Sequence, residues 1–129
     1  MNPSFNDIGR SFASHYYNLF DTKEQRPQIA ALYHPTDSLL TFEGQQIQGQ
    51  QAIVEKMKGI PLEDMQRTVT TLDCQPTADG GVLISVLGQL KNSSENDKVM
   101  GFSQTFLIKP FNNSFFIFHD IFRLVLHNI

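Results

Sequence analysis

One segment organises the middle of this chain, and it reads Leu40-Thr41-Phe42-Glu43-Gly44-Gln45-Gln46-Ile47-Gln48-Gly49. Extended runs at 38–42 and 45–48 flank the pair Glu43-Gly44, which predicts a two-residue hairpin turn in which Gly44 takes the positive φ. Phe42 ends the first strand, and Glu43 is expected at the hairpin tip. The segment therefore presents one exposed acid beside one aromatic ring.

Helical periodicity is found on both sides of this hairpin. Near the N-terminus, a helix from about 5 to 20 is predicted by apolar residues at helical steps, namely Phe5, Ile8, Phe12, Tyr16, Leu19 and Phe20. A shorter second helix is expected from about 25 to 33. A third helix follows Gly49, closes at Gly59, and has an inward face made of Ile53, Met57 and Ile60. The helices and the hairpin are all expected to pack as a cover over the sheet that the second half of the chain forms.

The second half of the chain predicts four long strands, at about 65–75, 82–91, 98–109 and 114–126, from its β-branched content and the turn clusters between them. Helices followed by an antiparallel meander indicate an α+β domain with its helices on one face of a sheet. We expect a cone: N-terminal helices packed on a strongly bent antiparallel sheet.

The bulk properties set limits on the class of protein. At 129 residues the chain is predicted to form one domain, residues 1–129, and its formal charge of −3 gives no basic footprint for nucleic acid. The single cysteine, Cys74, excludes an internal disulfide. Without a signal-like start or an apolar run of roughly 18 residues, a soluble intracellular protein with no membrane insertion is expected.

Several motifs resemble those of the nuclear transport factor 2 family, in the family's order and over essentially the whole chain. Besides the hairpin segment they are Ser11-Phe12, His15-Tyr16-Tyr17, Leu19-Phe20-Asp21, Gly88-Gln89-Leu90, Met100-Gly101-Phe102 and Asp120-Ile121-Phe122-Arg123-Leu124. The resemblance implies a cystatin-like roll and a homodimeric, non-enzymatic carrier without cofactor, which takes the GDP form of Ran into the nucleus. Such a carrier works in the cytoplasm, the nucleus and the nuclear pore complex of the nuclear envelope.

The resemblance also implies a binding site for Ran. Glu43 matches the family's acid after the hairpin aromatic, and Glu95 and Asp97 keep the acid-x-acid spacing of a second recognition loop, between Asn92 and Lys98, that appears longer here. Phe42 would line a hydrophobic cavity whose walls are Ile60, Leu62, Met65, Leu90 and Met100. From the residues alone, acids at such positions are usually solvated loop charges, and apolar residues at such spacing are usually plain core. Arg67 stands where animal members often have His near the cavity.

Two further interfaces are expected. Phe5 stands where the family carries Trp or Phe, and the resemblance implies that it helps to bind Phe-x-Phe-Gly repeats of nucleoporins, although it could equally be a hydrophobic staple at the helix start. The last strand, 115–126, is too apolar on both faces for one side to be solvated. This pattern favours a symmetric dimer formed between sheets.

Two other functions are left open by the sequence. Enzymes such as ketosteroid isomerases and scytalone dehydratase share related cone folds, and the candidates for acid–base chemistry here are Asp73, Asp120, Tyr16, Tyr33, His15 and His119. None has a diagnostic spacing, the four His are scattered without a metal-ligand pattern, and His119 and Asp120 should point to opposite faces of a strand. The remaining alternative is a diverged paralogue that acts as a dimerisation or mRNA-export subunit.

Overall fold

The computed structural model describes residues 1–93 and 98–125 of the chain. The elements, in order, are the α-helix α1 (Phe5–Phe20), the 3₁₀ helix η1 (Arg26–Leu32), β1 (Leu39–Phe42), β2 (Gln45–Gln48), α2 (Gln50–Gly59), β3 (Met65–Pro76), β4 (Val82–Asn92), β5 (Val99–Phe111) and β6 (Ser114–Val125). Each predicted helix and strand is present. The second helix is of the 3₁₀ type, which is common in short connectors.

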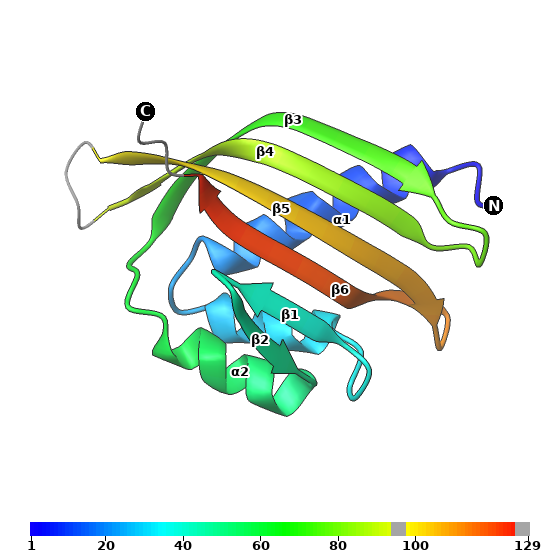
Figure 1. The fold of residues 1–129 in the computed structure, drawn as a ribbon, viewed down its shortest axis with the longest axis horizontal. Helices are drawn as coiled ribbons and strands as arrows, with labels where there is room; N and C mark the ends of the chain where they lie inside the picture. The colour runs from blue at the N-terminus through cyan, green and yellow to red at the C-terminus, as the bar shows by residue number, and fades with distance from the viewer. Residues whose placement is uncertain (94–97, 126–129) are drawn as a thin grey trace.

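All six strands form one curved sheet in the order β2-β1-β6-β5-β4-β3, with the helices gathered on its concave side (Figure 1). Strands β3 to β6 make the predicted antiparallel meander. The β1–β2 hairpin was expected to be part of the cover, and this expectation was wrong. It extends the sheet instead, because β1 pairs in parallel with β6 and places Phe42 opposite Phe122.

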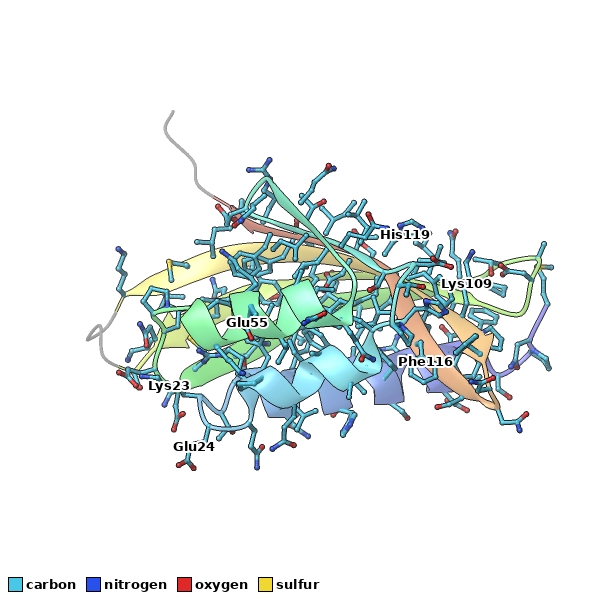
Figure 2. The ribbon with its side chains drawn as sticks, turned by 90° about the horizontal axis from the view of Figure 1, so that it is seen from below. Lys23, Glu24, Glu55, Lys109, Phe116 and His119 are labelled. Atoms are coloured by element: carbon cyan, nitrogen blue, oxygen red, sulfur yellow. The ribbon has the colours of Figure 1, made fainter. Side chains whose placement is uncertain are left out.

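The core lies between the concave face of the sheet and the helices. Helix α1 buries Ala13, Tyr16, Tyr17 and Phe20, and the ring of Tyr16 meets that of Phe106 on β5 with centroids 4.9 Å apart. Helix α2 lies beside η1 and turns its predicted face inward, since Ile53, Met57 and Ile60 are 0%, 2% and 6% exposed. Figure 2 views this helical layer, with Glu55 on α2.

The outer face of the sheet is less polar than an ordinary solvated surface. Leu83 and Leu87 on β4 and Ile121 on β6 are exposed, the last two by about half. Between them in the ladder lie short side chains such as Ser103 and Thr105. An exposed apolar sheet face of this kind is typical of a surface that meets another protein.

Gly88 on β4 is required where β3 contains a bulge, between Val69 and Thr71. A Cβ atom at this position would overlap the carbonyl oxygen of Thr68 and crowd the ring of Phe102. We expect Gly88→Ala to lower the free energy of unfolding by about 1–3 kcal/mol, because backbone must move to admit the methyl group. Chemical denaturation measures this. The matched control is Ser85→Ala, an exposed site on the same strand, which should change stability by less than about 0.5 kcal/mol.

Candidate functional site

The hairpin tip holds Glu43 in a defined and uncommon conformation. Both turn residues have positive φ, 51° at Glu43 and 87° at Gly44, as a type I′ turn requires, whereas the sequence predicted this only for Gly44. The Glu43 backbone N–H donates to the carbonyl of Phe122 over 3.0 Å. Its carboxylate oxygen Oε1 accepts from the backbone N–H of Leu124. Glu43 is thus exposed yet oriented against the end of β6.

Phe42 lies next to this acid and is half-buried. Its ring stacks on Phe122 with centroids 4.9 Å apart and an interplanar angle of 20°, as the parallel pairing of β1 with β6 allows. The ammonium group of Lys56 on α2 lies 5.1 Å from the centre of the Phe42 ring. Phe42 therefore closes the concave side of the sheet at the end where the hairpin turns.

A small cavity of about 10 Å³ lies behind Phe42, which is room for about one water molecule. It is lined by Tyr16, Phe20, Phe42, Arg67, Gln104 and Phe122. Of the six side chains predicted to form a hydrophobic cavity, Phe42 is the one that lines this cavity. Ile60, Met65 and Leu90 are buried in the core, and Leu62 and Met100 are half-buried against it. Their role towards a partner stays a prediction.

Arg67 on β3 forms one wall of this cavity and is held by Asp21, the residue after α1. Its Nε and Nη2 donate to the Asp21 carboxylate, with Nη2 to Oδ1 at 2.7 Å, and its side chain is 5% exposed. The guanidinium carbon lies 4.0 Å from the ring centre of Tyr17 and 4.7 Å from that of Phe102. Nη1 is buried and finds no acceptor among the described residues. The sequence marked Arg67 as a departure from the family but did not predict the pair with Asp21.

A buried hydrogen-bond network adjoins the same cavity. Asp120 is fully buried and accepts from Tyr33 Oη at 2.5 Å, Tyr16 Oη at 3.3 Å and Gln104 Nε2 at 2.9 Å. Tyr17 Oη in turn donates to Gln104 Oε1 at 2.8 Å. The sequence named Asp120, Tyr16 and Tyr33 separately as acid–base candidates, and the fold brings them together. Gln104 carried no signal in the sequence.

Burial dominates the titration of this network. It raises the pKa of the Asp120 carboxyl from 3.8 to about 6, while the hydrogen bonds from Tyr33, Gln104 and Tyr16 oppose the rise. Burial, with the nearby Asp120 charge, raises the pKa of Tyr16 and Tyr33 well above 10.0. The cavity has no space for a substrate beside these groups. The other candidates do not join them: His15, Asp73 and His119 are all exposed, and His119 points away from Asp120 as expected.

The two remaining predicted site regions are placed differently. Glu95 and Asp97 lie outside the described residues. Since Gly101 pairs with Val125, the start of β5 lies at the sheet end where β6 and the hairpin tip finish. Phe5 begins α1 and packs half-buried against the core.

Within residues 1–93 and 98–125, no three His, Cys, Asp or Glu side chains are grouped as they would be to hold a metal ion. The same part of the chain contains no helix that is long and apolar enough to span a membrane. The candidate site thus consists of the oriented carboxylate of Glu43, the half-buried ring of Phe42 and the small aromatic cavity behind that ring.

A helical layer over a curved six-stranded sheet that encloses a small aromatic cavity defines the nuclear transport factor 2-like, or cystatin-like, class of α+β domains. Residues 8–124 match the Nuclear transport factor 2 (NTF2) domain. Nuclear transport factor 2 of Saccharomyces cerevisiae is 42% identical over 125 residues, covering 96% of this chain and 97% of that protein. The probable nuclear transport factor 2 of Caenorhabditis elegans is 41% identical over 132 residues, covering 99% and 98%. The solved structure of nuclear transport factor 2 from Cryptosporidium parvum superposes with a TM-score of 0.89 at 38% identity, covering 97% of this chain and 98% of that one. The chain belongs to the nuclear transport factor 2 family.

Proposed function

We propose that this chain is a non-enzymatic nuclear transport carrier, which binds the GDP form of Ran at the hairpin end of the cone and nucleoporin repeats near Phe5. Membership of a family whose named relatives are transport factors supports the general role. The observation that carries the assignment of the site is the oriented carboxylate of Glu43 beside Phe42. The carrier would shuttle between cytoplasm and nucleus through the pore complex.

The conformation of Glu43 supports a role in recognition. A non-glycine residue with positive φ costs of order 1–3 kcal/mol, and such positions gather at functional sites. Glycine or asparagine would occupy this turn position more comfortably than Glu43. The turn conformation and the Leu124 N–H together direct the carboxylate, which would lose little freedom when it pairs with a basic side chain of Ran. Selectivity for the GDP form would follow if switch II presents its basic and aromatic groups in that nucleotide state.

A homodimer is part of the same proposal. The exposed face that contains Leu83, Leu87 and Ile121 suits a symmetric contact between the sheets of two copies. Phe5, half-buried at the start of α1, leaves part of its ring available to apolar repeat peptides. Aromatic anchors of this kind suit weak, rapidly exchanging contacts with many Phe side chains.

Glu43→Lys is expected to weaken binding of GDP-loaded Ran by roughly thirtyfold or more, because loss of one member of an interfacial charge pair costs about 2–5 kcal/mol. The measurement is a titration of purified Ran, loaded with GDP or with GTP, against the wild-type protein and the variant. We expect the wild-type protein to bind the GDP form alone.

The matched control is Glu55→Lys on α2, an acid whose side chain is 70% exposed and which lies on the helical layer instead of the hairpin (Figure 2). This charge reversal should leave the affinity within about twofold of the wild-type value, as remote surface charges are screened by salt. If neither nucleotide form of Ran binds the wild-type protein, the carrier proposal fails. If the two variants lose the same amount of affinity for Ran, Glu43 does not belong to the Ran-binding site.

A further inference from the structure

The hairpin tip keeps a strained conformation that other parts of the chain must stabilise. Glu43 has a φ of 51°, and a non-glycine residue with positive φ persists only where its surroundings hold it there. On one side, β6 provides this support: the Phe122 carbonyl accepts from the Glu43 N–H over 3.0 Å, and the Leu124 N–H donates to the Glu43 carboxylate. The support on the other side comes from α2, which lies beside β2 (Figure 1).

Lys56 is the residue of α2 that reaches this turn. Its ammonium nitrogen Nζ donates to Oε1 of Gln45 at 3.0 Å and lies 5.1 Å from the centre of the Phe42 ring. Phe42 and Gln45 face each other in the hairpin ladder, as the last residue of β1 and the first residue of β2. Lys56 therefore contacts both of the residues that close the Glu43-Gly44 turn.

The helix that carries Lys56 is itself fixed by its core contacts. On that helix, Ile53 and Met57 are buried, at 0% and 2% exposed. Lys56 is half-buried, whereas Lys58, in the same last turn of α2, is exposed and pairs with Glu55 at 3.6 Å. Both lysines are favoured near a helix C-terminus, where the helix dipole attracts cations. The dipole therefore does not explain why Lys56 lies against the hairpin.

The charge of Lys56 is unfavourable at a surface that binds basic side chains. Lys56 forms no salt bridge within residues 1–93 and 98–125, so no carboxylate of that part of the chain neutralises it. A like charge beside an interface slows association with a basic partner. If Lys56 supports binding, its contacts with Phe42 and Gln45 must outweigh this repulsion. The two effects can be separated, because repulsion acts on association and a loosened site acts on dissociation.

We propose that Lys56 is a positioning residue of the hairpin site: it fastens the end of β1 and the start of β2 to α2, and so keeps the Glu43 carboxylate and the Phe42 ring in one orientation. Lys56 acts through these residues and need not touch the partner. A site that is ordered before binding loses less conformational freedom when the complex forms. That the partner is the GDP form of Ran rests on the proposed function, whereas the fastening of the turn does not.

Amide hydrogen exchange, followed by NMR on the free protein, tests the fastening without Ran. The Leu124 N–H is the reporter, because its bond to the Glu43 carboxylate breaks when the turn loosens. Lys56→Met keeps an unbranched side chain but removes the ammonium group, and should speed this exchange by about fivefold or more, while amides of β5 exchange as in the wild type. Lys56→Arg keeps a cation with hydrogen-bond donors, and should restore the wild-type rate within about twofold. The matched control, Lys58→Met, should exchange as the wild type does.

Stopped-flow kinetics with GDP-loaded Ran then separate the positioning role from the charge. Lys56→Met should associate up to about twofold faster, because one like charge is gone, and dissociate about tenfold faster, because the tip is no longer ordered before binding. Gln45→Ala removes the hydrogen bond and keeps the charge. This variant should therefore dissociate faster than the wild type without any gain in the rate of association.

Three results would overturn the proposal. If Leu124 exchanges at the same rate in Lys56→Met as in Lys58→Met, the turn is ordered without Lys56. If exchange becomes faster evenly over β4 and β5, Lys56 only stabilises the fold. If Lys56→Met binds Ran more tightly with unchanged dissociation, Lys56 is a repulsive charge alone. Should the wild-type protein bind no Ran, the carrier proposal fails, and the exchange measurement still decides whether Lys56 holds the turn.

Discussion

Replacement of Arg26 by methionine is expected to lower the free energy of unfolding by about 3–5 kcal/mol. Arg26 is 1% exposed, and its guanidinium donates to three backbone carbonyls: Phe20 at 2.8 Å, Leu62 at 2.7 Å and Glu63 at 2.8 Å. It also lies 4.9 Å from the ring centre of Phe20. Burial lowers the pKa of this guanidinium, so the carbonyls compensate a charge that water no longer solvates. Methionine fills much of the volume but leaves all three acceptors unpaired.

Equilibrium denaturation in urea measures this change. The matched control is Arg10→Met, since Arg10 is exposed and donates to a single carbonyl, that of Leu72 at 3.1 Å. This substitution should cost less than about 1 kcal/mol. A loss below about 1 kcal/mol for Arg26→Met as well would mean that the three carbonyls find other donors. The arginine would then not be what joins the end of α1 to the segment that leads into β3.

The pH dependence of stability is the second large effect, and it centres on Asp120. The pKa of this carboxyl is about 6 in the folded protein and near 3.8 when unfolded, because burial disfavours the charged form. Between these values the native state holds one more proton than the unfolded state, so the free energy of unfolding falls as the pH rises. Each pKa unit corresponds to about 1.4 kcal/mol, and the fall should total about 2.5 kcal/mol between pH 4 and pH 7.

Asp120→Asn removes this contribution. Free energies of unfolding, obtained from denaturant titrations at pH 4, 5, 6 and 7, should show the variant gaining about 2.5 kcal/mol relative to the wild type across the series. Other acids also contribute to the pH dependence of the free energy of unfolding in both proteins. These contributions cancel when the value for the wild type is subtracted from that for the variant. Asp73→Asn, at an exposed position on β3, serves as control and should follow the wild-type curve. A difference between Asp120→Asn and the wild type that stays constant with pH would place the Asp120 pKa near its ordinary value.

Much of the fold could be predicted because the relevant signals are local. The helical stripe that begins at Phe5, the Glu43-Gly44 turn and the inward face of α2 each depend on residues within a few positions of one another. The strands of the meander were located in the same way. The parallel pairing of β1 with β6 was not, because residues 39–42 pair with 119–122 and no local pattern encodes such a register.

The candidate site shows the same contrast between residues that local signals indicate and contacts that only long-range packing creates. Glu43 and Phe42 were named from the hairpin, and the structure adds the Leu124 N–H that holds the acid and the Phe122 ring that backs the aromatic. The pair of Arg67 with Asp21 joins residues 46 positions apart, and nothing in either neighbourhood distinguishes them from ordinary surface charges. Here the resemblance to a family indicated a position but not its contacts.

The sequence by itself determined the α+β class, the positions of the helices and strands, the exposed acid beside an aromatic ring and the family. Those features follow from short-range periodicity, turn chemistry and motif order. Only the tertiary structure decided that Tyr16 and Asp120, 104 residues apart, share one buried network, and that the cone encloses a cavity walled by Arg67. The physical reason is that burial and hydrogen-bond partners are set by how distant segments pack, and side-chain type alone does not specify which buried polar groups will meet.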